Sequence, residues 1–529
     1  MLEMPPKSPI RFFNTTGPCF PSEHYTLPPE DRLVGAQLHR YIRDKLYWVL
    51  HAPRQTGKTT FLLSWLNEIG SGNDVAACYV SIERCQRLAD LERCMPALCN
   101  AIRESADFFH LPVPELSTND PSSMVSNILI DWSRKTAPKP LVVLFDETDA
   151  LEGDAMISFL RQLRGGFMSR GIGKFPISIA LVGMRDLKDY ITTAKDGEPP
   201  SPLSPFNIKA DSVLLGNFTP EEVRKLFAQR TEETGQQITD EALEYVWEQS
   251  LGQPWIVNSL FMRATLRVLQ EDDYSTVTLE HIEKAREQMI LARETHLDSL
   301  AVRLREPGIR RMMETLFSGE VNLDLASSDA FRMCLDLGLV RLDKGVPSIA
   351  NPIYREVLAR QITFGPQAMI PEIDWRWEKS DGSLDMDALL KEFQKFWREN
   401  SEYWETKTDY TEAFPHLLLM AFLQRVLNGG GRIEREYAAG RGRMDLFVEY
   451  KAGQFIIEIK LIHDKKSPEA IKAQGLEQIA KYRDTKAPHA PAYLVIFDRR
   501  DTAKDLSWDE KIYWQEEAVP SGTVTVLGC

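Results

Sequence analysis

The chain has 529 residues, 43% of them apolar and 26% charged, a composition typical of globular domains rather than of a disordered chain. Its 63 Lys and Arg against 77 Asp and Glu give a formal net charge of −14, which argues against a general polyanion binder but allows a basic groove in one domain. The seven cysteines form no C-x-x-C pair, so we expect reduced thiols. The N-terminus has no apolar signal region, and no window approaches the ~20 apolar residues of a membrane span. We therefore expect a cytoplasmic protein with no membrane partner.

The first 215 residues alternate short apolar runs with helical patterns, and at roughly 150 residues per domain the whole chain has room for three or four domains. Apolar runs at 47–52, 75–82, 140–147 and 177–184 are predicted as strands. Val-, Ile- and Leu-rich runs separated by helices are typical of a parallel sheet that is covered on both faces. We therefore predict an α/β core over residues 1–215.

The segment that follows the first strand, APRQTGKTT, fits the Walker A pattern of a small residue, four variable residues and Gly-Lys-Thr. Gly57 lets the backbone turn its N–H groups toward phosphates, Lys58 reaches the β and γ oxygens, and the Thr59 hydroxyl coordinates Mg²⁺. We predict an ATP site that includes the whole segment: Ala52, Pro53, Arg54, Gln55, Thr56, Gly57, Lys58, Thr59 and Thr60.

A second part of this site is predicted at the end of the third strand, LVVLFDET. The strand delivers Asp146 and Glu147 at its carboxyl end, where sheets of this kind bind their ligands. We expect Asp146 to hold Mg²⁺ together with Thr59, and Glu147 to polarise the attacking water. The pair indicates hydrolysis of ATP rather than storage.

From about residue 218 the pattern becomes helical, and Thr219 with Pro220 forms a helix start with an N-cap and Pro in the first turn. We predict a helical lid at 216–300. Two helices and a short hairpin at 301–365 are predicted as a winged helix, and an amphipathic helix at 366–400 as a linker. A separate unit is predicted at 401–529.

The N-terminal ~360 residues resemble the AAA-like, STAND-type ATPases, which include archaeal-type ATPases and Cdc6/Orc relatives. The motifs APRQTGKTT, LVVLFDET, LVGMR, LGNFTPEEV, GQP and IANPIYREV carry this resemblance. The resemblance implies that Arg185 senses the γ-phosphate, that Pro254 in the lid contacts nucleotide and that the segment around Tyr25 lines the adenine pocket. No arginine finger is identifiable, so hydrolysis in trans within a ring is not supported.

The C-terminal unit contains two strands, MDLFVEY and FIIEIKL, joined by KAGQ, whose Gly suits a hairpin turn. Side chains alternate along a strand, so Glu458 and Lys460 share one face of an otherwise apolar strand. Asp445 begins the adjacent strand and can reach the same place. Two carboxylates that converge there can bind Mg²⁺, and the lysine can orient water and offset charge on a phosphate.

This D…E-x-K arrangement resembles the PD-(D/E)XK nuclease superfamily, in which Met444 here replaces the usual proline. The resemblance implies that Asp445 and Glu458 are metal ligands and catalytic residues, that Lys460 is the catalytic lysine and that Glu412 is a further metal ligand. Gln478 and Tyr482 match the Q-x-x-x-Y motif of some members. The flanking arginines Arg432, Arg435, Arg441 and Arg443 are candidates for holding phosphates.

The sequence as a whole predicts an α/β P-loop ATPase core with a helical lid and a winged helix, followed by an α/β PD-(D/E)XK nuclease-like domain. We expect an ATP-dependent or ATP-regulated DNA endonuclease, with ATP and Mg²⁺ as cofactors and Mn²⁺ as an alternative at the nuclease site. Double-stranded DNA would contact the winged helix and the nuclease domain of a homo-oligomer, in defence against foreign DNA. The alternatives are a non-cutting STAND-type signalling ATPase, a DNA-remodelling ATPase and a nuclease fold that binds DNA without cutting it.

Overall fold

The computed structural model describes residues 11–33, 38–72, 74–88, 90–185, 208–270, 273–292, 295–318, 328–369, 377–405, 414–427, 431–439, 442–451, 453–462, 467–485, 487–498, 500 and 506–529. The chain divides into two compact units. The N-terminal unit comprises Met1–Glu294, Met333–Arg341 and Ala350–Ile353, and the C-terminal unit comprises Thr295–Arg332, Leu342–Ile349 and Tyr354–Cys529. Among the described residues, no helix is long and apolar enough to cross a membrane.

A parallel sheet of five strands, in the order β2-β3-β4-β1-β5, forms the centre of the N-terminal unit. Its strands are β1 (Tyr47–His51), β2 (Ala76–Ser81), β3 (Leu141–Asp146), β4 (Ser178–Gly183) and β5 (Lys209–Leu214). The first four confirm the predicted strands. The fifth was not predicted, because β5 is an edge strand in which only Val213 is buried and which therefore has no apolar run.

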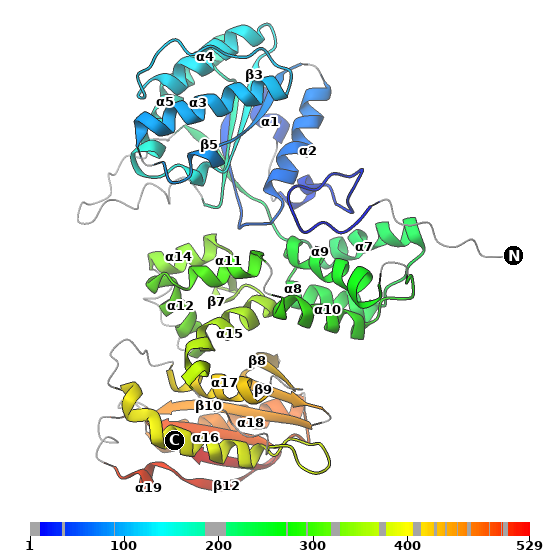
Figure 1. Cartoon of the computed structure of the whole chain (residues 1–529), viewed down its shortest axis with the longest axis vertical. Helices are drawn as coiled ribbons and strands as arrows, with labels where there is room; N and C mark the ends of the chain where they lie inside the picture. Colours follow the sequence, from blue (N-terminus) through cyan, green and yellow to red (C-terminus); the bar gives the residue numbers. More distant parts are fainter. Residues whose placement is uncertain are drawn as a thin grey trace, which may run out of the picture. The chain divides into compact units, whose positions relative to one another are not determined.

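Helices cover both faces of this sheet, as Figure 1 shows. One apolar core lies against α3 (Leu91–Phe108), α4 (Met124–Thr136) and α5 (Gly153–Phe167). The other lies against α1 (Leu38–Arg43) and α2 (Lys58–Ser71). Neighbouring residues of β1 alternate between the two cores, as Tyr47 and Val49 belong to the first and Trp48 and Leu50 to the second. This two-sided burial explains the continuous apolar runs of the central strands.

The region predicted as a lid consists of helices α7 (Pro220–Thr234), α8 (Asp240–Ser250), α9 (Pro254–Arg263) and α10 (Leu279–Leu291). The start of α7 is fixed by a capping box, in which the Thr219 hydroxyl accepts from the Glu222 backbone N–H and the Glu222 carboxylate accepts from the Thr219 N–H.

Helices α11 (Thr295–Arg303), α12 (Pro307–Ser318) and α14 (Asp329–Asp336) follow, then the strands β6 (Val340–Asp343) and β7 (Val346–Ile349) and the helix α15 (Pro352–Met369). The two strands form a separate two-stranded sheet. Its role as the wing of a DNA-binding winged helix stays a prediction.

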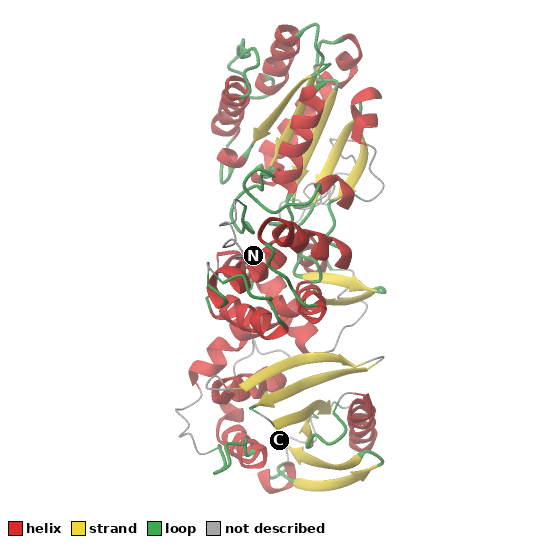
Figure 2. Ribbon diagram, turned by 90° about the vertical axis from the view of Figure 1, so that its right-hand side faces the viewer, coloured by secondary structure: helices red, strands yellow, loops and turns green. Residues whose placement is uncertain are grey.

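The C-terminal unit is built on a mixed sheet of six strands in the order β12-β13-β11-β10-β9-β8. The strands are β8 (Gly431–Ala439), β9 (Gly442–Tyr450), β10 (Gly453–Ile462), β11 (Ala492–Asp498), β12 (Trp514–Val519) and β13 (Gly522–Gly528). β10 lies inside the sheet, antiparallel to β9 and parallel to β11. Figure 2 shows these strands with helices around them, and Figure 1 labels the short α19 (Trp508–Lys511) of the same unit.

Long helices cover the two faces of this sheet. α18 (Pro468–Thr485) packs on the face that carries Ile496, whereas α16 (Met386–Glu405) packs on the face that carries Phe497. α17 (Phe414–Leu427) contacts α16 through aromatic side chains. The amphipathic helix that we predicted as a linker is therefore part of this domain, because its apolar side is buried against the sheet.

Candidate functional site

The loop between β1 and α2 is shaped as a phosphate cradle. Gly57, just before the first turn of α2, has φ of +94°, and Gln55 has φ of +57°, so the loop depends on left-handed backbone conformations. The Lys58 ammonium folds back along the loop and donates to the carbonyls of Ala52 at 2.8 Å and Pro53 at 2.9 Å. Burial lowers the pKa of Lys58, and nearby Asp146 opposes this shift. The lysine is thus held at the mouth of the cradle, where phosphates would bind.

Asp146, at the end of β3, is almost completely buried beside this loop. Its Oδ2 accepts from the Thr59 hydroxyl at 2.7 Å and from the Tyr79 hydroxyl at 3.1 Å, while Oδ1 accepts from the Glu147 N–H at 2.9 Å. Burial raises the pKa of Asp146, and the Thr59 hydrogen bond and the Lys58 charge counteract this shift. Adjoining hydroxyl and carboxylate oxygens are the hard donors that Mg²⁺ prefers, so Thr59 and Asp146 fit the metal of a nucleotide complex.

Glu147 follows Asp146 in a left-handed conformation, with φ of +58°. Such a conformation is costly for a residue with a side chain and is concentrated at functional sites. Desolvation, followed by the charge of Glu83 and of the neighbouring aspartates, raises the pKa of Glu147 to about 7. The carboxylate is therefore poised near neutral pH as a proton acceptor.

These groups surround a cavity of about 680 Å³, a size suited to a nucleotide. Its lining comes from the phosphate loop, the ends of β2, β3 and β4, and the N-terminal segment: Gly17, Pro18, Arg54, Gln55, Gly57, Lys58, Thr59, Thr60, Tyr79, Ser81, Glu83, Gln86, Asp146, Glu147, Asp149, Ala150 and Met184. Tyr79 and Ser81 were not predicted. Their signal was their alternation with buried Cys78 and Val80 along β2, which places both on one face.

Three residues of the predicted segment support the loop instead of lining the cavity. Ala52 and Pro53 contribute the carbonyls that hold Lys58, and the Thr56 hydroxyl donates to the Pro53 carbonyl at 2.8 Å. Their side chains are turned toward the protein, so their role in ATP binding would be structural.

The Gly-Gln-Pro motif contacts the phosphate loop through Gln253, and the predicted contact of Pro254 with nucleotide stays a prediction. Gln253 Nε2 donates to the Gln55 carbonyl at 3.3 Å, whereas Pro254 begins α9, is buried and is not part of the cavity lining. Gly252 has φ of +74°, and a Cβ there would lie 1.9 Å from the Phe218 carbonyl oxygen. The glycine therefore permits a backbone approach that brings Gln253 to the loop.

Arg185 is close to the cavity but does not line it. Met184 contributes to the lining, and the Arg185 guanidinium lies beside Asp336, with Nε 3.4 Å from Oδ2. The predicted contact of Arg185 with a γ-phosphate stays a prediction.

Arg32, at the end of η1 (Pro29–Arg32), is buried beneath the phosphate loop. Its Nη1 donates to the carbonyls of Thr56 at 2.8 Å and Gly216 at 3.0 Å, and its guanidinium lies 4.9 Å from the Phe218 ring centroid. Burial lowers the pKa of Arg32 to about 10, which leaves it charged at neutral pH. Arg32 thus ties the loop to the start of the lid and places a second positive charge behind the cradle.

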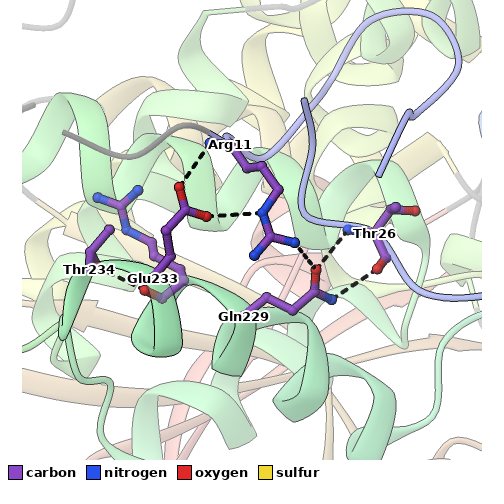
Figure 3. Close-up of polar contacts among 6 residues, drawn as sticks. Arg11, Thr26, Gln229, Glu233 and Thr234 are labelled. Atoms are coloured by element: carbon purple, nitrogen blue, oxygen red, sulfur yellow. Dashed lines mark hydrogen bonds and ion pairs between the residues drawn. The ribbon is translucent and has the colours of Figure 1, made fainter. Parts of the chain in front are cut away.

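Residues 11–26, here called the strap, are fastened to lid helix α7, as Figure 3 shows. The Arg11 backbone N and Nε donate to the Glu233 carboxylate at 3.1 and 3.0 Å, and Arg11 Nη1 donates to Gln229 Oε1 at 3.2 Å. Gln229 also bonds the backbone of Thr26, donating through Nε2 to its carbonyl at 2.9 Å. The strap is therefore held at both of its ends.

The middle of the strap contacts the nucleotide cavity. The Cys19 N–H donates to the Thr60 hydroxyl at 3.0 Å, and Gly17 and Pro18 line the cavity. Tyr25 is fully buried against other aromatic rings and is not part of this lining, and the predicted adenine pocket around it stays a prediction. Sequence patterns gave no signal for the Cys19 contact, because its partners are 41 positions apart.

Removing the contacts of Arg11 with α7 is expected to increase the rate of nucleotide release. Arg11→Ala eliminates a half-buried ion pair and should increase the dissociation rate of a fluorescent ADP about fivefold, since such a contact contributes ~1 kcal/mol. The control is Lys225→Ala, which changes an exposed residue of α7. Stopped-flow displacement measures both rates, and equal rates would show that the strap does not retain nucleotide.

The second candidate site lies on β10 of the C-terminal unit. Glu458 is 1% exposed, and its Oε1 accepts from the Lys460 ammonium at 2.6 Å. Ile456, two residues earlier, packs with Ile479 and Tyr482 of α18, so alternation places Glu458 and Lys460 on the same face. The predicted acid–base neighbours on an apolar strand are thus brought together, and the carboxylate is desolvated beside its cation.

The other predicted acids are only partly described. Asp445 lies in β9 immediately before Leu446, which pairs with Ile457, the residue that precedes Glu458. The side chain of Asp445 and the whole of Glu412 lie outside the described residues. The arginines of β8 and β9 (Arg432, Arg435 and Arg443) have no described side chains, and Arg441 is also outside.

Gln478 and Tyr482, the predicted Q-x-x-x-Y pair, both lie on α18, which covers the face of β10 that carries Glu458. Tyr482 is buried in the apolar core beneath α18, and Gln478 Oε1 is a buried acceptor with no hydrogen-bond partner. Within the described part of the chain, no three His, Cys, Asp or Glu side chains cluster as a metal site. Glu458 alone supplies a described carboxylate, whose hard oxygens fit Mg²⁺ or Mn²⁺.

One family model matches part of the C-terminal unit. Residues 410–496 match the PD-(D/E)XK nuclease superfamily, and this span contains Glu412, Asp445, Glu458 and Lys460. The chain thus carries a PD-(D/E)XK nuclease domain at these residues. A search of curated proteins finds no significant match.

Several solved structures resemble the N-terminal part. The Walker-type ATPase PABY2304 of Pyrococcus abyssi is 16% identical, covering 65% of this chain and 99% of that chain with a TM-score of 0.46. Cdc6p from Pyrobaculum aerophilum is 13% identical over 62% and 91% of the two chains, with a TM-score of 0.35. The RuvB Holliday junction branch migration motor of Thermotoga maritima is 16% identical over 59% and 88%, with a TM-score of 0.32.

Proposed function

We propose that this chain is an ATP-regulated, metal-dependent DNA endonuclease. The observation that carries the proposal is the buried Glu458–Lys460 pair, on an inner strand of a domain that matches a nuclease superfamily. The same chain contains a cavity with the phosphate-loop lysine, the metal-binding oxygens and a carboxylate poised near neutral pH. The two sites together support nucleotide control of DNA cleavage.

At the nuclease site, Asp445 and Glu458 would hold a divalent cation, with Glu412 as a further ligand. The metal supplies Lewis-acid charge next to the scissile phosphate. Lys460 orients a water molecule for attack and offsets the negative charge that develops on the phosphate oxygens. Its Nζ lies 2.6 Å from Oε1 of Glu458, which holds the side chain beside the proposed metal ligand.

At the nucleotide site, Lys58 would turn from the loop carbonyls to the phosphate oxygens, and Thr59 and Asp146 would hold the Mg²⁺ of the nucleotide complex. Glu147 accepts a proton from the attacking water. Arg32 supports the cradle from behind through its bond to the Thr56 carbonyl.

Replacing the proposed base is expected to separate binding from hydrolysis. Glu147→Gln keeps the size of the side chain but cannot accept the proton, so ATP turnover should fall by about 10²- to 10³-fold. ATP affinity, measured by calorimetry, should stay within about threefold, because no phosphate contact is removed. Exposed Glu152→Gln is the control. Unchanged turnover in Glu147→Gln would exclude Glu147 as the base.

We also propose that double-stranded DNA contacts residues 301–365 as a winged helix and the arginines of β8 and β9, which would hold phosphates. The chain would act in the cytoplasm as a homo-oligomer in defence against foreign DNA. A STAND-type switch would connect the nucleotide state to the nuclease domain.

Incubation of the full chain with supercoiled plasmid, ATP and Mg²⁺ or Mn²⁺ tests the proposal. Nicked and linear DNA should accumulate, and EDTA should abolish the products, because it removes the divalent cation that would supply Lewis-acid charge at the site. If intact plasmid remains with either metal, the nuclease proposal fails, and the non-cutting signalling or remodelling ATPase becomes the better account.

A further inference from the structure

The last residue of α14 and the two residues after it (336–338), here called the corner, contact the nucleotide-binding part of the N-terminal unit. Asp336, the last residue of α14, places its Oδ2 3.4 Å from Nε of Arg185. Both side chains are largely sheltered, with 22% and 17% exposed, respectively. Arg185 directly follows Met184, a cavity residue. The ion pair therefore lies next to the nucleotide cavity, and the Arg185 guanidinium is directed at Asp336.

Close backbone contact holds this corner in place. Gly338 has φ of +69°, and its N–H donates to the Leu335 carbonyl at 2.9 Å, which ends the helix. A Cβ at Gly338 would lie 2.6 Å from Cβ of Pro53. Pro53 belongs to the phosphate loop, and its carbonyl accepts from Lys58 at 2.9 Å. One short corner thus contacts both the loop and the arginine after β4.

A γ-phosphate and Asp336 would compete for the same guanidinium. A terminal phosphate carries more negative charge than a carboxylate and can accept two N–H bonds from an arginine. A diphosphate offers no such group at the end of the cavity, so Arg185 would remain with Asp336. The ion pair would thus lower the affinity for ATP and leave the affinity for ADP unchanged.

We propose that Asp336 is a specificity-determining residue that sets the preference between ATP and ADP by competing for Arg185. When the γ-phosphate binds Arg185, Asp336 loses its partner and the corner at residues 336–338 is released. The position of the segment after residue 338 then depends on whether ATP or ADP is bound. The inference rests on the proposed ATP binding and adds to it the residue that distinguishes the two nucleotides.

The test compares binding of ATPγS and ADP, each with Mg²⁺, to the full chain by calorimetry. Asp336→Asn removes the charge and keeps the shape, so it should tighten ATPγS binding about fivefold and leave ADP within about twofold. Asp336→Glu should behave as wild type. Asp329→Asn, on the exposed side of the same helix, should change neither affinity.

A double-mutant cycle makes the result specific. In an Arg185→Ala background, Asp336→Asn should have no further effect on ATPγS, because the competition is gone. Equal changes for both nucleotides, no change in either, or a full Asp336→Asn effect in the Arg185→Ala background would each overturn the inference while leaving ATP binding intact. Absence of ATPγS and ADP binding in the wild type would overturn both the inference and the proposed ATP site.

Discussion

Replacing Lys460 by alanine is expected to lower the rate of plasmid cleavage by about 10²- to 10³-fold. The ammonium lies 2.6 Å from a carboxylate that is 1% exposed, so its charge acts in a desolvated place where electrostatic effects are strong. Without Lys460, no described cation on β10 remains beside Glu458 to orient water or to offset charge on the phosphate.

Two further variants separate chemistry from folding. Lys460→Arg keeps a positive charge beside buried Glu458 and should fold as wild type. Its guanidinium is broader and planar, so its N–H donors should be misplaced and the variant should lose most activity. Lys481→Ala, an exposed residue of α18 in the same domain, should cut at the wild-type rate. Thermal melting monitors folding, and nicking of supercoiled DNA over time measures activity. Cleavage by Lys460→Ala at the wild-type rate would exclude this lysine from the mechanism.

Replacing Lys58 by alanine is expected to weaken binding of ATP about 100-fold, since hydrogen bonds to charged groups contribute ~1.5–3 kcal/mol. The carbonyls of Ala52 and Pro53 hold the Lys58 ammonium within the phosphate loop, so its removal takes the cation out of the cradle. Hydrolysis should fall with binding at ordinary ATP concentrations. DNA cleavage by this variant should no longer respond to ATP.

The control for this variant is Lys174→Ala, an exposed lysine of the same unit, which should bind and hydrolyse ATP normally. Calorimetry gives the affinities and phosphate release gives the turnover. If Lys58→Ala retains wild-type affinity, the cavity does not bind phosphates as proposed. If it loses ATP but still cuts DNA in the same way with or without nucleotide, the result supports ATP as a control element rather than as a reactant in cleavage.

The sequence was most informative where burial imposes a strong pattern. Strands β1, β3 and β4 are buried on both faces, so their apolar runs were predictable. Strands β5 and β12 each lie at a sheet edge and have at most one buried position, so neither has a distinctive apolar run. The helix α16 was predicted as a linker because an amphipathic pattern does not identify the surface against which it packs.

The candidate sites show the same limit. Local motifs predicted Lys58, Asp146 and the Glu458–Lys460 pair, because each arrangement is set by neighbours in sequence. Long-range partners were not predictable, as with the strap residue Cys19 on Thr60. The Gly-Gln-Pro motif did not reveal the contact of Gln253 with the phosphate loop, which depends on the positive φ of Gly252 and its close approach to Phe218.

The most direct test of the central claim is the initial rate of strand breakage in supercoiled DNA by the wild-type chain with Mg²⁺, measured without nucleotide, with ADP and with ATP. The account predicts strand breaks whose rate differs between ADP and ATP by several-fold, and which disappear in Lys460→Ala. Strand breaks at one rate in all three conditions would contradict nucleotide control, and intact DNA in all three would contradict the nuclease itself.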